Sequence, residues 1–412
     1  MSPEMLAYPF LFIAIFFESF VLVTFLSKPA REARARSSQE SGLPSVAVIV
    51  PCWNEESTIA ATAESLLALD YPKGRLEIVL VNDGSTDGTK AAMDRFAENP
   101  QVRVIHKENG GKHTALNAGI VATDAEFIGC LDADSFVDPA ALREIIPCFA
   151  RPEVAAVTAA MSIHQPKTLV QHMQNAEYTF GITQRHALAS VNGLYVTPGP
   201  FSFYRRSALE AVGLFRHGHQ TEDMEMALRL QRDGYAIENA PRARVYTKSP
   251  DTVRKLVKQR TRWTSGFLRN VLGEYRSLIG SRHGTLGLLV LPTAIFAVLS
   301  GILTFTLAVG RAAHSILSAI EIRAGIPASY ALVPHGAFDW FYIPTSFFLL
   351  LGAITLVASA LLIVVGKRIS NTPGDMKLGI ISYALLYGFV APLWLLRATA
   401  DVAVGRKRGW RS

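Results

Sequence analysis

The clearest pattern along the 412-residue chain is the uneven distribution of apolar residues, which gather in long runs near both ends. The run Tyr8 to Leu26 contains one charged residue, Glu18, and is long enough to cross a bilayer core of about 30 Å as a helix. Two further runs, Leu286 to Val309 and Phe341 to Val365, have the same character. These runs predict an integral, multi-pass membrane protein.

The middle of the chain has a different pattern, in which short β-branched runs alternate with helix-like segments. Four such runs predict strands, Val46 to Pro51, Leu76 to Ser85, Val102 to Lys107 and Glu126 to Ser135. The alternation is typical of an α/β fold with a parallel sheet covered by helices. Ligands bind such sheets at the carboxyl ends of the strands, where this sequence places Asn54, Glu55, Asn82, Asp83, Asp132 and Asp134.

Beyond the fourth predicted strand the pattern indicates helices. The segment Met161 to Leu209 predicts a long helix followed by a loop rich in Gly and Pro. Another helix is expected to begin at Glu222. A further one, from about Thr252 to Asn270, mixes Lys and Arg with Leu, Phe and Trp, a composition typical of a helix that lies on a membrane surface.

The net charge of +7 is concentrated in stretches that flank the apolar runs. Basic flanks favour the cytoplasm, so the basic segment after the first run predicts an outside N-terminus and a cytosolic middle region at the cell membrane. These stretches favour anionic lipid headgroups, and not nucleic acid, as partners. The three cysteines form no C-x-x-C pair, which fits a reducing cytosol.

The last apolar run, Leu378 to about Ala400, allows two interpretations because it contains Pro392 and ends among charged residues. A third C-terminal crossing would place the basic tail outside, against the positive-inside tendency. The run could instead be re-entrant or interfacial. We divide the chain into a first span (1–27), a linker (28–44), a cytosolic catalytic domain (45–250), interfacial helices (251–283) and a C-terminal membrane region with a basic tail (284–412).

Short acidic and glycine-rich motifs provide candidate chemistry at the predicted sheet edge. Asp132 and Asp134 have the spacing and the hard oxygen ligands to hold Mg²⁺ or Mn²⁺, which would in turn bind a diphosphate. Lys112 follows two glycines at a predicted helix start and could reach a phosphate, although a solvated lysine beside a flexible turn is an equal alternative. Asp83 begins a segment whose composition is typical of a simple turn.

The segment Thr221-Glu222-Asp223 also has two interpretations. Thr221 is a good helix N-cap, and two carboxylates in the first turn complement the helix dipole. The structural role is favoured on this ground alone, but a carboxylate at a helix start that faces a cleft with a cation in it is also a fair general base toward a sugar hydroxyl. The sequence does not choose between a structural and a catalytic role here.

On the predicted basic helix, Gln259, Arg262 and Trp263 are spaced to share one face. A tryptophan and an arginine there could bind a sugar ring and a diphosphate. A tryptophan with basic neighbours at a membrane surface also needs no ligand.

Seven motifs in this order, VPCWNEE, VNDGSTDGT, GGKHTALN, DADS, PGPFSFYRRSAL, TEDMEMALRL and QRTRW, resemble the membrane-bound family 2 glycosyltransferases. That family includes the synthases of hyaluronan, chitin, cellulose and poly-N-acetylglucosamine. The resemblance covers about Ser45 to Asn270 and implies a GT-A fold with inverting transfer from a nucleotide sugar, usually a UDP-sugar. The sequence departs from many relatives in having one leading span where they have two.

The resemblance also implies roles for individual residues. Asp223 would be the catalytic base with Glu222 beside it, and Asp132 and Asp134 would hold Mg²⁺ or Mn²⁺. The nucleotide sugar would be bound by Pro51, Glu55, Asp83, Lys112, Asp132, Gln259, Arg262 and Trp263. The acceptor would contact Trp263, Gly199, Pro200 and Phe201.

We therefore expect a membrane β-glycosyltransferase that extends a polysaccharide from UDP-N-acetylglucosamine or UDP-glucose. A glycan or lipid-linked acceptor and membrane lipids would be its partners. The alternative is transfer of a single sugar to a lipid such as a polyprenyl phosphate or a glycolipid. A non-enzymatic binding protein or transporter is the third possibility, and it predicts that Asp223→Asn leaves function intact.

Overall fold

The computed structural model describes residues 8–27, 42–322 and 347–406, so most of the predicted linker and the last residues of the basic tail lie outside the described residues. Eight strands form one sheet in the order β3-β2-β1-β4-β7-β6-β8-β5. Their bounds are β1 Val46–Cys52, β2 Leu76–Asp83, β3 Val102–Lys107, β4 Phe127–Cys130, β5 Ser135–Val137, β6 Val154–Ile163, β7 Ser202–Arg205 and β8 Ala236–Thr247.

The first four strands confirm the predicted parallel, helix-covered sheet. Strand β1 pairs in parallel with β2 and with β4, and β2 pairs in parallel with β3. Almost every position of β1 and β2 is buried, which is why they appear in the sequence as continuous apolar runs without alternation. Their carboxyl ends meet at one edge of the sheet.

The second half of the sheet corrects the prediction for Met161 to Leu209. Met161 belongs to strand β6, the long helix begins only at Leu169, and β7 interrupts the region predicted to be a loop. All ten positions of β6 are buried and many are alanine, so its pattern cannot be distinguished from a buried helix. Strand β6 pairs in parallel with β8, and β7 pairs antiparallel with both β6 and β4.

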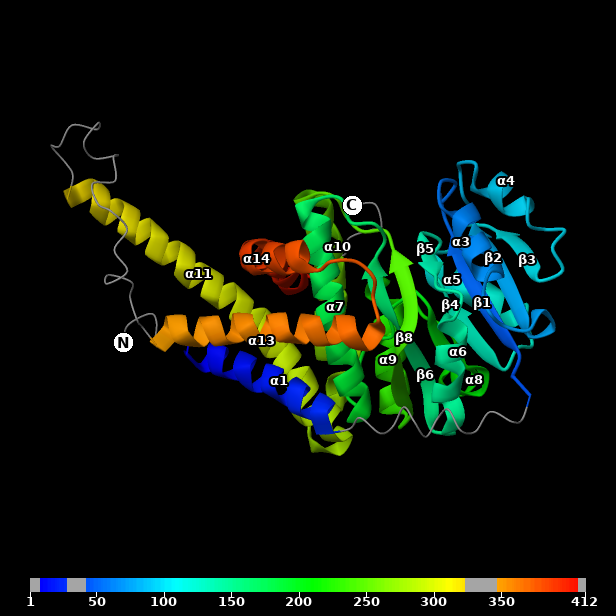
Figure 1. The fold of residues 1–412 in the computed structure, drawn as a ribbon, viewed down its shortest axis with the longest axis horizontal. Helices are drawn as coiled ribbons and strands as arrows, with labels where there is room; N and C mark the ends of the chain where they lie inside the picture. The colour runs from blue at the N-terminus through cyan, green and yellow to red at the C-terminus, as the bar shows by residue number, and fades with distance from the viewer. Residues whose placement is uncertain (1–7, 28–41, 323–346, 407–412) are drawn as a thin grey trace.

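Helices cover both faces of the sheet, with one apolar cluster on each face. Figure 1 shows α3 and α4 beside the first strands, and α8 and α9 near β6 and β8. Their bounds are α3 Ile59–Leu67, α4 Thr89–Asp94, α5 Lys112–Val121, α6 Ala141–Ile145, α8 Arg206–Val212 and α9 Glu222–Arg232.

Two longer helices stand between the sheet and the apolar helices (Figure 1). Helix α7 spans Leu169–Ser190 and begins with a capping box in which the Thr168 hydroxyl accepts from the Gln171 amide. Helix α10 spans Val253–Arg269 and confirms the predicted basic helix. Short helical turns connect α10 to the membrane-directed part of the chain.

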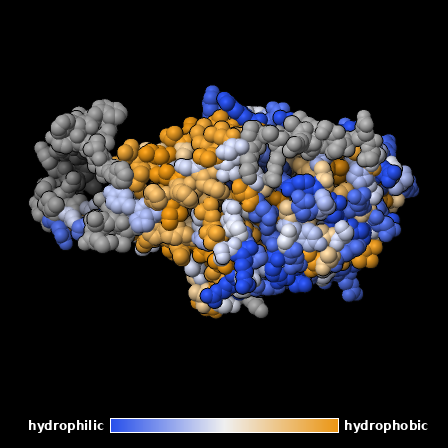
Figure 2. Space-filling view, turned by 90° about the horizontal axis from the view of Figure 1, so that it is seen from below, coloured by the Kyte–Doolittle hydropathy of each residue, from blue (hydrophilic) through white to orange (hydrophobic). Residues whose placement is uncertain are grey.

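Within the described residues, four helices have the length and apolar composition needed to cross a membrane. They are α1 Tyr8–Ser27, α11 Leu291–Ile322, α13 Phe347–Ser370 and α14 Lys377–Ala403. Helices α1, α11 and α13 extend from the same side of the sheet domain, whereas α14 is seen nearly end-on beside α7 and α10 (Figure 1). Figure 2 shows apolar side chains gathered over this half of the molecule.

Helix α14 continues through Pro392 and buries one face against α7 and α10. Val390, Ala391 and Trp394 of α14 pack with Met173 of α7 and Leu256 of α10. Its other face exposes a stripe of large apolar side chains, Leu378, Ile381, Leu385, Phe389, Leu393 and Leu396. Both the packed face and the exposed face of α14 therefore carry large apolar side chains.

Candidate active site

A cavity of about 1680 Å³ opens at the carboxyl ends of the first strands and continues between α7, α10, α11 and α14. It brings together nearly all the residues singled out in the sequence. Its lining includes Pro51, Glu55, Asp83, Lys112, Asp132, Asp134, Gly199, Pro200, Glu222, Asp223, Gln259, Arg262 and Trp263.

Phe201 is the exception and corrects the predicted acceptor set. Its side chain is completely buried, its φ is +61°, and its ring lies edge-to-face on Phe203 with 4.8 Å between ring centres. The backbone turns after Pro200, so that Gly199 and Pro200 line the cavity while Phe201 joins the core.

Lys112 lies at the centre of the charged part of the cavity. Gly111, with φ +92°, precedes α5 and lets the chain turn into the helix at Lys112. The Lys112 Nζ lies 2.5 Å from Asp132 Oδ1 and 3.3 Å from Glu222 Oε1. Although burial opposes its protonation, the nearby carboxylates raise the pKa of Lys112. The alternative of a solvated lysine is therefore wrong.

Gly199 is required by this close packing of charges. A Cβ atom on Gly199 would lie 2.8 Å from Lys112 Nζ and 2.9 Å from Asp132 Oδ2. Any larger residue would displace the ion pair between these side chains. The motif PGPFSFYRRSAL indicated Gly199 as a site residue, but only the structure shows that a side chain there would collide with Lys112 and Asp132.

Helix α9 presents Glu222 and Asp223 to the cavity from its first turn. Thr221 occupies the N-cap position, but its hydroxyl donates to the Gly218 carbonyl and makes no capping bond to the helix. The predicted side-chain cap is therefore wrong, because the hydroxyl is used by the preceding loop. Asp223 Oδ1 instead accepts from the Met224 amide at 2.8 Å.

Asp223 is partly buried, and the like charge of Glu222 lies beside it. Burial and the charge of Glu222 raise the pKa of Asp223 to about 6, and the charge of Lys112 opposes this shift. A carboxylate with a raised pKa is a better proton acceptor than an ordinary one, while at neutral pH it is still mainly ionised. The first turn of α9 therefore carries a candidate general base, Asp223, directly after the N-cap residue Thr221.

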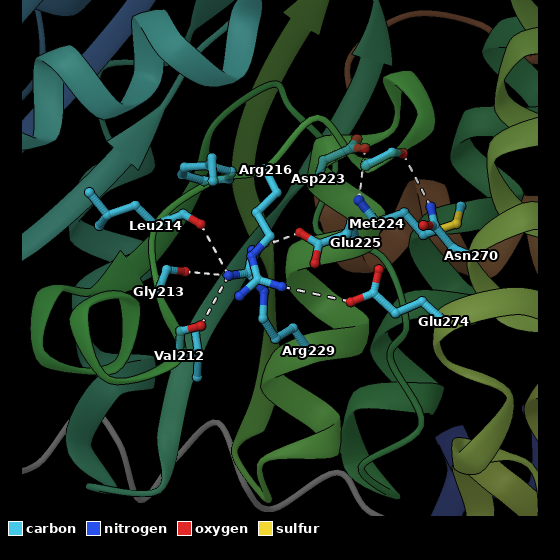
Figure 3. A network of polar contacts seen from close by, with 12 residues as sticks. Val212, Gly213, Leu214, Arg216, Asp223, Met224, Glu225, Arg229, Asn270 and Glu274 are labelled. Carbon is cyan, nitrogen blue, oxygen red and sulfur yellow. Dashed lines mark hydrogen bonds and ion pairs between the residues drawn. The ribbon is translucent and has the colours of Figure 1, made fainter. Parts of the chain in front are cut away.

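A network behind α9 fixes its position (Figure 3). The Arg229 guanidinium is fully buried, lies 2.7 Å from Glu225 and donates to the carbonyls of Val212 and Leu214. The Tyr275 hydroxyl also donates to Glu225. Because this ion pair and these hydrogen bonds join α9 to the Val212–Leu214 segment and to Tyr275, the network anchors the helix that carries Asp223.

Asp83 acts on the loop before α5. Its Oδ1 accepts from Lys107 Nζ at 2.5 Å and from the Gly110 amide at 3.0 Å, and its Oδ2 accepts from the Gly111 amide at 2.8 Å. Asp83 lines the cavity as well. The Asp83 carboxylate therefore holds the loop that contains Gly110 and Gly111 and precedes Lys112.

The carboxylates after β4 have an excess of negative charge. Asp134 is partly buried, and burial together with the charges of Asp132 and Glu55 raises its pKa to about 7. A cation would relieve this repulsion, and oxygen ligands suit Mg²⁺ or Mn²⁺. The described residues contain no group of three or more His, Cys, Asp or Glu side chains placed to hold a metal. A metal on this pair would need further ligands from a substrate or from water.

Helix α10 brings Gln259, Arg262 and Trp263 to the opposite wall of the cavity, as their spacing predicted. Arg262 Nη1 donates to the Gln220 carbonyl at 3.3 Å, which ties α10 to the loop before α9. Gln259 Oε1 is buried and accepts no hydrogen bond from the residues that the structure describes.

Two residues next to Trp263 were not found from the sequence. Arg260 Nη2 lies 2.8 Å from Glu177 Oε2 of α7, and the Arg260 guanidinium carbon lies 4.2 Å from the centre of the Trp263 ring. Glu177 and Arg260 are separated by 83 positions, so no local spacing predicts the pair. The one available signal was that Arg260 lies three positions before Trp263 on the same helix.

The comparisons with known proteins agree with this geometry. Residues 44–266 match the sequence profile described as "Glycosyltransferase like family 2". A poly-beta-1,6-N-acetyl-D-glucosamine synthase of Staphylococcus epidermidis is 32% identical over 266 residues, which are 64% of this chain and 64% of that protein. The enzyme of the same name from Staphylococcus aureus strain COL is 32% identical over 257 residues, 61% of this chain and 62% of the relative. The chain thus matches less than two thirds of the length of these relatives.

Among solved structures, a mannosyltransferase from Pyrobaculum calidifontis in complex with GDP-Man and Mn²⁺ has a similar fold. The TM-score is 0.59 with 20% sequence identity, and the match covers 96% of this chain and 99% of the other. This similarity extends the likeness of fold from the GT-A sheet to the apolar helices. Because the family profile matches more than half of the chain, the protein belongs to the glycosyltransferase-like family 2.

Proposed function

We propose that this glycosyltransferase transfers N-acetylglucosamine, with inversion, from UDP-N-acetylglucosamine to a growing β-linked polysaccharide. The observation that carries the proposal is the position of Asp223, a partly buried carboxylate with a raised pKa in the same cavity as Lys112 and the Asp132–Asp134 pair. The names of the relatives support the choice of sugar and product. Their names also favour polysaccharide extension over the transfer of a single sugar to a lipid.

In the proposed step, an acceptor hydroxyl oxygen attacks the anomeric carbon of the donor. The bond between that carbon and the diphosphate oxygen breaks, the electron pair leaves with UDP, and the hydroxyl proton passes to the Asp223 carboxylate. A single displacement of this kind inverts the anomeric centre. The Arg229 network would hold Asp223 in place during the transfer.

Two walls of the cavity, α5 and α10, would supply positive charges around the UDP leaving group. Lys112 and Arg262 face the cavity from α5 and α10, and either can stabilise the developing negative charge on UDP. Asp132 and Asp134 would hold Mg²⁺ or Mn²⁺, which would act as a Lewis acid toward the diphosphate when bound. Glu55 and Pro51 would bound the nucleoside part of the site.

The four apolar helices support a multi-pass membrane protein. The basic residues after the first apolar run are the reason why we propose that the sheet domain lies in the cytosol. We place α14 at the membrane interface, because it packs across α7 and α10 and is seen nearly end-on where α1, α11 and α13 extend together (Figure 1). With three crossings, the basic tail stays on the cytosolic side. This arrangement removes the conflict with the positive-inside tendency.

The test is UDP release by purified protein with Mg²⁺ or Mn²⁺ against a panel of UDP-sugars, with products sized on a gel. We expect release from UDP-N-acetylglucosamine and a ladder of long products that a β-1,6-N-acetylglucosaminidase degrades. One short lipid-linked product would contradict polysaccharide extension. Release from none of the donors would contradict the proposed donor class.

A further inference from the structure

One face of α7 forms part of the cavity wall. Tyr178, Gly181, Arg185 and Leu188 all line the cavity and are spaced by three or four positions along the helix. Tyr178 lies beside Arg260, whose guanidinium carbon is 5.4 Å from its ring centre. Arg185 is seven residues further on, or roughly 10 Å along the helix axis.

Arg185 is a half-buried cation that has no carboxylate partner among the described residues. Its Nε and Nη2 atoms are buried and make no hydrogen bond with any residue that the structure describes. Burial lowers the pKa of Arg185 to about 10. By contrast, the buried Arg229 and Arg260 each have a carboxylate within 2.8 Å. Buried charges are normally paired, so an unpaired one that borders a cavity points to a missing anion.

Gly181 makes room for this cation. A Cβ atom on Gly181 would lie 3.0 Å from Arg185 Nη1, so the guanidinium lies close over the preceding turn of α7. The Nε and Nη2 atoms find no hydrogen-bond partner among the described residues, and Gly181 itself lines the cavity. The sequence therefore supplies both the charge and the space beside it.

The residues next to Arg185 in α7 contact two apolar helices, and these contacts indicate the depth of Arg185 relative to the membrane. The adjacent His186 ring lies 6.0 Å from the ring of Phe25, near the end of α1. Thr183 donates to the Leu362 carbonyl at 2.7 Å, in the second half of α13. In the proposed orientation, these are the cytosolic ends of both spans. Arg185 therefore lies at about the depth of the lipid phosphates of the cytoplasmic leaflet.

The cavity wall as a whole is mainly apolar. Phe17 of α1, Leu188 of α7 and Ala294 and Val298 of α11 contribute apolar side chains to it, and Gln184, next to Arg185 in the chain, contributes a polar one. Such a wall provides few hydrogen-bonding partners for the hydroxyls of a free sugar chain. It suits a hydrocarbon chain whose polar end is an anion.

From this juxtaposition we propose that Arg185 binds the phosphate of a membrane lipid that carries the first acceptor sugar, with its hydrocarbon chain against the apolar wall. The inference rests on the proposed function and adds the chemical class of the initial acceptor. Arginine suits this role because its planar guanidinium can donate two parallel hydrogen bonds to a phosphate. Arg185 would act as a specificity residue for initiation and would not touch the reacting atoms.

The test uses the full-length protein in nanodiscs and two acceptors that carry the same sugar on the same isoprenoid chain. One acceptor has a phosphate between sugar and lipid, and the other is a phosphate-free glycoside. We expect wild-type protein to have a lower KM for the phosphate-bearing acceptor. Arg185→Gln should raise that KM by roughly ten- to a hundredfold and leave the KM for the phosphate-free glycoside near its wild-type value.

Matched variants separate charge from structure. Arg185→Lys should retain much of the preference, because it keeps the cation but not the two-pronged geometry. Arg282→Gln, which removes an exposed arginine outside the cavity, should behave as wild type. Millimolar inorganic phosphate should not compete with the lipid acceptor. Effective competition would assign the site to free phosphate and overturn the lipid assignment.

A wild-type protein that uses both acceptors equally would overturn the proposal, even if Arg185→Gln failed to fold. An equal rise of both KM values in Arg185→Gln would also overturn it, because the residue would then have only a structural role. Acceptor-independent UDP release is measured in parallel. Its absence from wild-type protein would show that the proposed donor reaction itself is wrong, which is a different outcome.

Discussion

The two ends of the cavity are built in different ways. At the sheet end, Asp83, Asp132 and Lys112 follow strands or begin a helix, and their charges pair with neighbours a few ångströms away. At the helical end, Arg260 and Arg185 lie on long helices among aromatic and apolar side chains. Arg260 is paired across two helices, and Arg185 is not paired within the described residues.

This difference separates what each end can recognise. The sheet end offers carboxylates and a lysine, which suit a diphosphate with a divalent cation. The helical end offers ring faces and apolar walls, which suit sugars and lipids. Changes at the sheet end should therefore reduce every reaction of the donor, whereas changes of Arg260 or Arg185 should affect only the use of an acceptor.

Asp223→Asn should have the largest effect, because it removes the base where the two ends meet. We expect transfer to fall by roughly a hundred- to ten-thousandfold, the usual contribution of a general base. Binding of the UDP-sugar, followed by titration calorimetry, should change little. Undiminished transfer in a folded Asp223→Asn protein would exclude this residue as the base.

Asp134→Asn should affect the donor end alone. Because Lewis-acid stabilisation is worth several kcal/mol, we expect metal-dependent UDP release to fall by about a hundredfold or more, with or without an acceptor. Titration of Mg²⁺ and Mn²⁺ against initial rates should show a higher metal requirement. An unchanged metal dependence would remove Asp134 from the site.

The pH dependence of the transfer rate should test whether Asp223 acts as the base with a raised pKa. Asp223 must be ionised to accept a proton and its pKa is raised to about 6, so the rate should rise with pH through this value and then level off. Well below it, each pH unit should cost roughly tenfold in rate. Initial rates of UDP release at saturating donor would measure this profile.

Glu222→Gln is the control for that profile. Its charge helps to raise the pKa of Asp223, so removing it should move the acidic limb to lower pH. A limb that stays in place would mean that another group controls the profile. The residual rate at high pH would report separately on the contact between Glu222 and Lys112.

Arg260→Gln should have the smallest effect and should be confined to the acceptor end. The cation–π contact that positions Trp263 is worth roughly 0.5–2 kcal/mol, so the acceptor KM should rise by about two- to thirtyfold. Hydrolysis of the donor without acceptor should be unaffected.

The partner of Arg260 gives a test of pairing. Glu177→Gln alone leaves Arg260 buried without its carboxylate, and the double variant removes both charges. We expect the double variant to be more stable in thermal unfolding than Arg260→Gln alone. Equal losses of donor hydrolysis and transfer in these variants would break the proposed division between the two ends.

The sequence by itself determined the first four strands, the basic helix and the main apolar helices. It also placed Glu55, Asp83, Asp132 and Asp134 at strand ends, because parallel strands carry whatever follows them to one common edge. These features depend on local periodicity and on neighbours in the chain. They could therefore be predicted without knowing the complete fold.

The tertiary structure alone decided the remaining features. Strand β6 is buried on both faces and has no alternation to reveal it, and Phe201 turned into the core although its motif suggested the cavity. The Arg260–Glu177 pair and the unpaired Arg185 depend on how α7 packs against α1, α10 and α13. Contacts between residues far apart in the chain arise from packing of whole elements, and no local pattern records which charge will find a partner.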